Sequence, residues 1–507
     1  MKKMNKLLAL VLAMVMVLGL AASAFAEAPA TPATYTITAP NNGHTYEVYQ
    51  IFTGDLHEGI LSNVKWGKNG TGTEGEAVSE AVLTELAGAT GSDTQKLAVI
   101  TKNVNLESEK YGVATNAAPL TNVPAGYYLI KDVDGAFAGQ DDAYTLYIVE
   151  VVQNVSIAPK SAKPTVDKQV HDETADAEAG ATDGWGESAD HAINESFQFK
   201  LIANLPADTD FDAYKTYKVV FTDTMSAGVT FESIASVTVD GVALTAEQYT
   251  CTATAGQAGG SWTLTINDIK AISGVSLNNG ADIVVIYNAH LNESAEVNHV
   301  SGNTSNKNTV GLEYSNNPNA GGEGSMGKTP EDTVWVFTYE VDNTKVDATD
   351  SSNKKPLAGA GFKLYDSTGT NEIGLIYDDS LNAYRPIKGA ETAVEMKSAD
   401  TTGKFNIVGL DAGTYILKET TVPAGYNKCA DVTVVIKATH AEAADGNSAT
   451  TTLTSDSNVT NEIENKQGST LPETGGIGTT IFYVLGGMLV VCAVVLMVSK
   501  KRMSAEG

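Results

Sequence analysis

The stretch Tyr217-Lys218-Val219-Val220-Phe221 places an apolar or aromatic side chain on every second residue. Successive side chains of a β-strand point to opposite faces of the sheet, so this period predicts a strand with one buried face. Asp431-Val432-Thr433-Val434-Val435-Ile436 repeats the pattern late in the chain. Such segments, rich in Val, Thr and Tyr, predict an all-β fold. The exception is Val78, Val82 and Leu86, whose spacing of four predicts a short helix.

Chain length and the strand patterns predict three tandem domains, each expected to be an immunoglobulin-like β-sandwich, and composition marks the borders between them. The chain has 507 residues, and turn-forming residues cluster near Pro159 to Pro164 and again at Ser315 to Gly322. The expected segments are a signal peptide at residues 1–26, sandwich domains at 27–160, 161–331 and 332–467, and a processed tail at 468–507.

One end of the chain carries a signal for export, and the other carries a segment that would hold the exported chain in the membrane. Lys2, Lys3 and Lys6 precede an apolar stretch, and the small residues of Ala24-Phe25-Ala26 predict cleavage by a signal peptidase, read at Ala24 and Ala26. Near the other end, an apolar run from Ile481 to Val498 is long enough to cross a membrane as a helix. The basic residues after that run would stay on the cytoplasmic side.

A sorting motif lies just before the apolar run. Leu471-Pro472-Glu473-Thr474-Gly475, the hydrophobic span and the basic tail together resemble the cell-wall sorting signal of Gram-positive surface proteins. The resemblance implies that a sortase cleaves between Thr474 and Gly475 and transfers the Thr acyl group to an amine. The expected location is therefore the cell wall, with peptidoglycan as one acceptor.

The overall charge excludes some partners. The formal net charge is −28, which argues against nucleic acid as a partner.

The cysteines and histidines do not form a recognisable site. Cys251 and Cys429 lie in different expected domains and Cys492 lies in the tail, so we expect no disulfide. The seven His are scattered, and neither a metal cluster nor a nucleophile–base grouping stands out. We therefore expect no metal, no cofactor and no enzymatic activity.

The third domain resembles the collagen-adhesin B-type domain. The similar stretches are Pro356-Leu357-Ala358-Gly359-Ala360-Gly361-Phe362-Lys363-Leu364 and the run from Tyr415 to Tyr426. The resemblance implies that Glu419, within the second stretch, promotes a spontaneous Lys–Asn isopeptide bond. Strand parity puts Lys345, Glu419 and Asn465 on apolar stripes, with Asn461 in the same phase as a competing partner.

The second domain shows the same three residue types. Lys168 shares a strand face with Val166 and Val170, and Asp223 and Asn308 also lie on apolar stripes. Burial lowers the pKa of a Lys and raises that of a carboxyl group, so the amine becomes nucleophilic. The protonated acid then polarises the Asn carbonyl. We expect bonds from Lys168 to Asn308 and from Lys345 to Asn465.

The first domain lacks one member of the set. Asp132 aligns with Glu419, but the opening strand Thr34-Tyr35-Thr36-Ile37-Thr38-Ala39 contains no Lys. We therefore expect no cross-link there, and interpret Asp132 as an ordinary strand-end carboxylate.

Lys160 is expected to face solvent, because Val155 and Ile157 form the apolar phase of its segment. The segment resembles the pilin motif of major pilus subunits, with Ala158 where the motif has Tyr. In that family the Lys attacks the sortase-bound end of another subunit. Lys163 is the alternative acceptor.

Together these features resemble a sortase-assembled major pilin, the backbone subunit of a Gram-positive fimbria. The resemblance implies a shaft that supports adhesion, with sortase, identical subunits joined covalently head to tail, and other pilins as partners. The alternative is a monomeric wall-anchored adhesin or a minor pilin that binds a host or matrix ligand.

Overall fold

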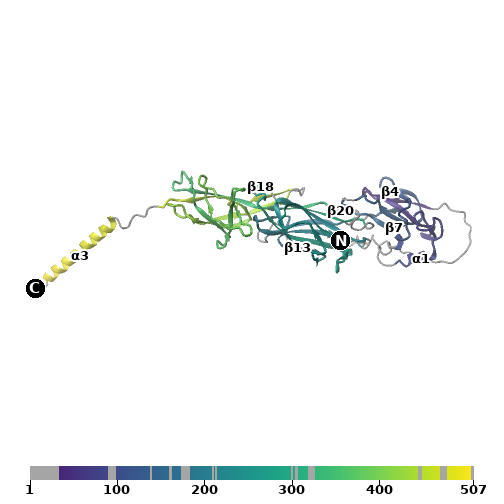
Figure 1. The fold of residues 1–507 in the computed structure, drawn as a ribbon, viewed down its shortest axis with the longest axis horizontal. Helices are drawn as coiled ribbons and strands as arrows, with labels where there is room; N and C mark the ends of the chain where they lie inside the picture. The colour runs from purple at the N-terminus through teal and green to yellow at the C-terminus, as the bar shows by residue number, and fades with distance from the viewer. Residues whose placement is uncertain are drawn as a thin grey trace.

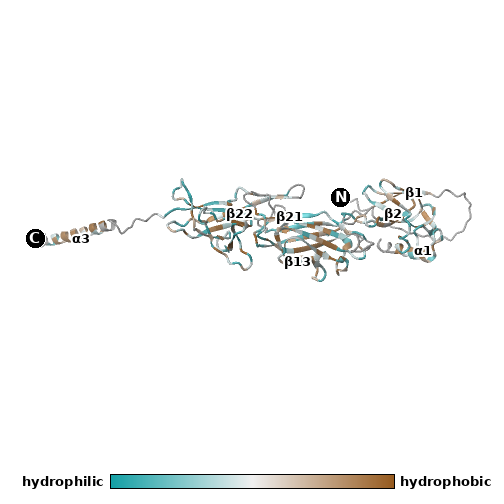
Figure 2. Cartoon of the chain, turned by 45° about the horizontal axis from the view of Figure 1, so that its top comes forward, coloured by the Kyte–Doolittle hydropathy of each residue, from teal (hydrophilic) through white to brown (hydrophobic). Residues whose placement is uncertain are grey.

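The computed structural model describes residues 33–89, 99–137, 140–158, 163–172, 183–207, 211, 214–297, 301–302, 306–317, 326–442, 448–468 and 477–503. Three β-rich bodies follow one another along an elongated molecule, and helix α3 (Ile477–Met503) lies beyond the last of them (Figure 1). The all-β architecture predicted from period-two patterning is confirmed. Hydrophobic residues are frequent in the strands of the bodies and also run along α3 (Figure 2).

The N-terminal body contains two sheets, of order β5-β1-β8 and β3-β2-β6-β7, with β4 added to β2. Their bounds are β1 Thr34–Thr38, β2 Thr45–His57, β3 Ile60–Trp66, β4 Gly112–Thr115, β5 Leu120–Pro124, β6 Gly126–Asp132, β7 Leu146–Val151 and β8 Val155–Ser156. The predicted short helix is present as α1 (Glu80–Ala87) and begins after Ser79. Val78 and Leu86 are buried in the same cluster, so the spacing of four marks the packed face.

The middle body is built on one large sheet of order β10-β9-β12-β17-β13-β19-β21-β11, with β14, β15, β16 and β20 off this path. Its strands are β9 Thr165–His171, β10 Trp185–Gly186, β11 Ser188–Asp190, β12 Ser196–Leu205, β13 Val219–Val239, β14 Val242–Ala243, β15 Thr250–Cys251, β16 Ala258–Ile266, β17 Ala281–Leu291, β19 Asn306–Ser315, β20 Met326–Lys328 and β21 Asp332–Phe337. Two 3-10 turns, η2 Ile269–Ala271 and η3 Leu277–Asn279, precede β17.

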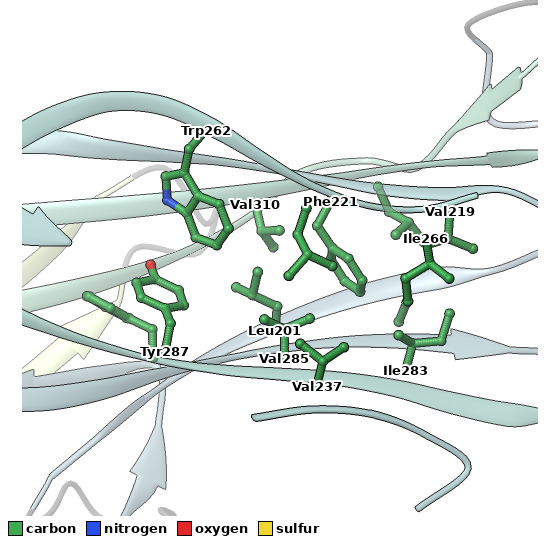
Figure 3. Close-up of a cluster of buried hydrophobic side chains, with 14 of the residues drawn as sticks. Leu201, Val219, Phe221, Val237, Trp262, Ile266, Ile283, Val285, Tyr287 and Val310 are labelled. Carbon is green, nitrogen blue, oxygen red and sulfur yellow. The ribbon is translucent and has the colours of Figure 1, made fainter. Parts of the chain in front are cut away.

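The long strand β13 joins two layers of this body. Its first half pairs with β16 and β19, and its second half pairs with β17. Side chains from both halves meet in one core, which includes Phe221, Val237, Trp262 and Tyr287 (Figure 3). Any polar side chain that points inward from these strands is therefore cut off from water.

The third body contains three sheets, of order β23-β22-β29-β27-β26, β25-β24-β30-β31 and β18-β33-β32, with β34 added to β22 and β28 to β24. The strands are β18 Ser301–Gly302, β22 Tyr339–Asp347, β23 Lys355–Pro356, β24 Gly361–Tyr365, β25 Glu372–Ile373, β26 Leu375–Asp378, β27 Ala383–Pro386, β28 Met396–Lys397, β29 Ile407–Leu410, β30 Gly413–Thr421, β31 Val432–Ile436, β32 Ala438–Glu442, β33 Ala449–Leu453 and β34 Thr460–Asn465. Strand β34 runs parallel to β22.

Strand β21 contributes to two cores. Val334 and Val336 pack in the core of the middle body, whereas Trp335 and Phe337 pack in the core of the third. The strand pairs with β19 and β11, both of the middle body. The strand therefore belongs to the middle body by its pairing and to both bodies by its packing, and the border at residue 331 stays a prediction.

Further contacts fix the joint between the middle and third bodies. Strand β18 arises between strands of the middle body, yet it pairs with β33. The Ile193 N–H donates to the carbonyl of Gly409 at 2.9 Å. At the other joint, the amide of Asn316 donates to the Phe137 and Asp142 carbonyls, each at 3.1 Å. These two bonds come from the Asn316 side chain, and the Tyr144 N–H also donates to the Asn316 carbonyl at 3.1 Å. Backbone hydrogen bonds thus cross both joints, which restrains bending of the molecule.

Candidate functional site

Lys345, Glu419 and Asn465 meet inside the third body. Strands β22 and β34 lie side by side, which brings Lys345 close to Asn465, and β30 supplies Glu419. Nζ of Lys345 lies 2.6 Å from Oδ1 of Asn465 and 3.6 Å from Oε1 of Glu419. The amide nitrogen of Asn465 donates to the same Glu419 oxygen at 2.7 Å. All three side chains are buried, so the amine, acid and amide touch one another in the absence of solvent.

The competing partner Asn461 lies elsewhere. It lies four residues before Asn465 on β34, which is two strand periods, and its amide donates to Oδ1 of Asn343 at 3.2 Å. Asn343 and Lys345 are both buried on β22, so the phase of that strand continues through the Asp342–Asn343 pair. Of the two asparagines, Asn465 is the one in contact with the Lys345 amine.

Lys168, Asp223 and Asn308 converge in the core of the middle body. Lys168 comes from β9, Asp223 from β13 and Asn308 from β19. The side chains of all three residues are fully buried. The Lys168 ammonium contacts the Asp223 carboxylate directly and lies 5.0 Å from the centre of the Phe199 ring. Strands β9 and β19 belong to the same sheet but are separated in its order by β12, β17 and β13, so the amine and the amide come from strands that do not pair with each other.

Burial shifts the pKa of Lys168, Asp223 and Lys345 toward the neutral form of each group. Desolvation lowers the pKa of Lys168, although the neighbouring Asp223 opposes the change. Desolvation likewise raises the pKa of Asp223, against the pull of Lys168. Desolvation lowers the pKa of Lys345 as well. A neutral amine is the nucleophilic form of Lys, so the arrangement supports attack on an adjacent amide carbon.

Tyr287 is a member of the middle cluster that sequence reasoning missed. Its hydroxyl lies 3.1 and 3.2 Å from the two carboxylate oxygens of Asp223 and 3.4 Å from the Lys168 amine. The amide nitrogen of Asn308 donates to the same hydroxyl. In the sequence, Tyr287 is in phase with buried Val285 and Ala289 and reads as an ordinary core aromatic. The sequence feature that could have indicated its role is the hydroxyl, because a buried Tyr hydroxyl usually has a hydrogen-bond partner.

Asp132 is the last residue of β6 in the N-terminal body, and it is buried. Its carboxylate lies 3.1 Å from Nδ1 of His44 and accepts the Thr145 N–H at 2.7 Å. The second ring nitrogen of His44 lies 2.9 Å from Asp142. Burial raises the pKa of Asp132. The interpretation as an ordinary carboxylate was wrong because the His44 contact joins residues distant in sequence; its neighbour here is an imidazole rather than a Lys–Asn pair.

Several expected processing residues lie outside the described residues: Ala24, Ala26, Lys160, Leu471, Pro472, Glu473, Thr474 and Gly475. Lys163 is described. Its side chain is about one-third exposed, and Nζ donates to the Asp141 carbonyl oxygen at 2.5 Å. Beyond the motif, Ile481–Lys501 forms a helix long and apolar enough to span a membrane.

Ser188, His440 and Asp190 form a hydrogen-bonded group that the sequence did not indicate. The His440 ring lies 2.9 Å from the Ser188 hydroxyl and 3.0 Å from the Asp190 carboxylate. Tyr339 also donates to Asp190. Ser188 and Asp190 lie on β11 of the middle body and His440 on β32 of the third, and all are almost fully buried. The group therefore forms part of the joint between the middle and third bodies. Because its side chains are buried there, a substrate could not reach them.

A second polar group lies at the same joint. His191, Glu195 and Asp411 bring one potential ligand atom each within 4.8 Å of the others. However, Nε2 of His191 bonds to the His171 carbonyl at 2.7 Å, and Glu195 accepts the Ala192 N–H. These bonds already give the His and Glu groups structural partners.

Two protein-family models match the C-terminal part of the chain. Residues 342–465 match the SpaA family of prealbumin-like fold domains, and residues 463–504 match the LPXTG cell wall anchor motif. The chain is a cell-wall-anchored surface protein. The matched anchor segment contains both Leu471–Gly475 and the part of α3 that is long and apolar enough to span a membrane. This confirms the surface location predicted from the sorting motif.

The anchored chain also has a curated relative. It is 25% identical over 360 residues to the trypsin-resistant surface T6 protein of Streptococcus pyogenes serotype M6. The match covers 64% of this chain and 54% of the relative, so the chain spans about half the length of the relative.

Among solved structures, the T6 backbone pilin of serotype M6 S. pyogenes is similar with 19% identity and a TM-score of 0.48, covering 88% of this chain and 100% of that one. The major pilin SpaD of Corynebacterium diphtheriae is similar with 18% identity and a TM-score of 0.44, covering 86% and 98%.

Proposed function

We propose that this surface protein is the backbone subunit of a sortase-assembled pilus, a structural component rather than an enzyme. The observation that carries the proposal is the pair of buried Lys–acid–Asn clusters in a chain that ends in an LPXTG anchor. Such clusters suit a protein that must resist force and proteases without disulfides, since its cysteines are free in the described structure. The relation to the T6 surface protein supports the same function.

Each cluster would form an isopeptide bond without an external catalyst. Proton transfer from the Lys to the acid gives a neutral amine, whose nitrogen attacks the Asn side-chain carbon. The C–N bond to the original amide nitrogen then breaks, and that nitrogen leaves as ammonia after taking up a proton. Fixed neighbours in a packed core react at high effective concentration. In the third body, Glu419 lies 2.7 Å from the departing nitrogen and is the proton carrier.

The bonds would act on both stability and extension. By analogy with a disulfide, closing a loop of more than about 100 residues stabilises the fold by roughly 5 kcal/mol. Lys345 and Asn465 are 120 residues apart. Because β22 and β34 run parallel, tension along the third body would pass through the covalent bond.

Polymerisation would join Thr474 of one copy to Lys160 of the next through a class C type sortase. Lys163 is the alternative acceptor, and its bond to Asp141 leaves it less available for attack. Partners in this scheme are sortase, identical subunits, other pilins and finally peptidoglycan. If the protein binds a host or matrix ligand, the assembled fibre would bind it.

The test is an immunoblot of wall extracts boiled in SDS, comparing the native chain with Lys160→Ala and Lys163→Ala. We expect a ladder of regularly spaced heavy species that collapses to monomer in Lys160→Ala and persists in Lys163→Ala. The reverse result would move the acceptor to Lys163. If the native extract contained only monomer, the result would contradict the proposed shaft function and favour a monomeric wall-anchored adhesin.

A further inference from the structure

The two clusters differ in how the acid reaches the amide. In the third body, the Glu419 carboxylate accepts directly from the Asn465 amide nitrogen at 2.7 Å. In the middle body the acid is Asp223, one methylene shorter, and the Tyr287 hydroxyl lies between it and Asn308. This hydroxyl contacts both Asp223 oxygens and receives the Asn308 N–H.

From this bridge we infer that Tyr287 is a catalytic residue of the middle cross-link, relaying a proton from Asp223 to the departing nitrogen of Asn308. The inference rests on the proposed isopeptide function and specifies how one of its two sites works. It adds a fourth group to the Lys–Asp–Asn set.

The relay balances without any further reactant. Asp223 is protonated at the start, because it has taken one proton from the Lys168 ammonium. It donates this proton to the Tyr287 oxygen, while the Tyr287 O–H proton moves to the Asn308 nitrogen. As the Lys168 nitrogen bonds to the side-chain carbon of Asn308, it loses a second proton to Asp223, which ends protonated. The carbon–nitrogen bond breaks with its electron pair on nitrogen, and ammonia leaves. Tyr287 ends as it began, and the products are one amide and one ammonia.

The position of Tyr287 suits this role. The side chain is fully buried on β17, and its ring packs edge-on against Trp262 with centroids 5.0 Å apart. The ring also lies 5.6 Å from Phe231. Figure 3 shows the hydroxyl directed into this apolar core. The ring is thus held by packing that does not depend on its oxygen, while desolvation raises its pKa and keeps the hydroxyl protonated.

The experiment is intact-mass spectrometry of purified full-length ectodomain carrying Tyr287→Phe, which keeps the ring and removes the hydroxyl. Each bond releases ammonia and lowers the mass by about 17 Da. We expect a total loss of about 34 Da in the native protein and about 17 Da in Tyr287→Phe, since the third-body bond remains as an internal reference. Circular dichroism would report whether the variant is folded.

A rescue variant separates a relay from a packing role. Asp223→Glu in the Tyr287→Phe background lengthens the acid, so the carboxylate reaches Asn308 as Glu419 reaches Asn465; we expect the second loss of about 17 Da to return. The same double variant decides the question if the single variant does not fold.

Two results would overturn the role of Tyr287. One is a full loss of about 34 Da in Tyr287→Phe at the native rate; the other is a folded double variant that lacks the bond. A native protein with no mass loss would instead overturn the isopeptide function itself.

Discussion

The amine nitrogen of Lys345 and the amide oxygen of Asn465 lie 2.6 Å apart on neighbouring parallel strands. Glu419 contacts the nitrogen of the same amide, so the amine and the acid both lie against the group that would react. In the middle body, by contrast, the Asn308 amide is held by Tyr287, and its Oδ1 has no hydrogen-bond partner in the described structure. The third-body bond is therefore the simpler of the two to test.

Asn465→Ala should remove the third-body bond and leave the middle one. The mass loss should fall from about 34 to about 17 Da, and the free energy of unfolding should fall by roughly 5 kcal/mol. Intact mass and thermal melting measure the two effects. Asn461→Ala is the matched control on the same strand, since Asn461 bonds to Asn343 instead. Loss of the bond in the control but not in Asn465→Ala would reverse the assignment.

Asp223→Asn should abolish the middle bond and destabilise the middle body. The change leaves the Lys168 amine fully buried without a counter-charge, which costs about 3 to 5 kcal/mol, in addition to the lost cross-link. Intact mass reports the bond and thermal melting the stability. Asp167→Asn, on the other face of the same strand as Lys168, is the control and should change neither quantity greatly. A normal mass loss in Asp223→Asn would contradict the role of the acid.

Stability should decrease in mild acid through His191. Burial lowers the pKa of this imidazole to about 4, and its ring stacks on Phe197. The unfolded chain binds the proton near pH 6.5 and the folded chain near pH 4, so the unfolded state gains the proton first. The free energy of unfolding therefore falls as pH drops from 6.5 to 4, by up to about 3 kcal/mol.

Calorimetry of the native protein and of His191→Gln over this pH range measures that effect. Gln keeps a donor for the His171 carbonyl but does not titrate. The melting temperature of the variant should depend less on pH than that of the native protein. Parallel curves for the two proteins would rule out His191 as the source.

Gly409→Ala should loosen the joint between the middle and third bodies. Gly409 has a φ of +76°, and a Cβ there would lie 2.4 Å from Cδ1 of buried Ile193. We expect a loss of about 2 to 4 kcal/mol from the backbone strain and overpacking combined. Gly359→Ala, with a φ of +77° and no atom within 4 Å of the added Cβ, isolates the backbone part. Equal melting temperatures for the two variants would show that the Ile193 contact is unimportant.

Strand parity was enough to predict much of each cluster. Alternation put Lys168 among inward-facing residues, and the structure buries it. Parity says which face a side chain occupies, however, and not which residues meet across the core. For that reason it left Asn461 and Asn465 as alternatives and gave no sign that Tyr287 stands between Asp223 and Asn308.

Contacts between bodies were the other part that the sequence did not reveal. The bond between His440 and Asp190 joins residues on different bodies, and each lies in a strand whose local pattern is unremarkable. The His44 contact that buries Asp132 is of the same kind. Such pairs depend on how the sheets stack, which no local period encodes.

The shared strand β21 has a consequence for the recombination of such chains. Its alternate side chains complete two neighbouring cores, so a crossover before Asp332 would take an inner strand from the middle body, and one after Phe337 would take two core aromatics from the third. Neither break leaves both partners whole. The middle and third bodies would therefore be exchanged between chains only as a single cassette, with their common strand inside it.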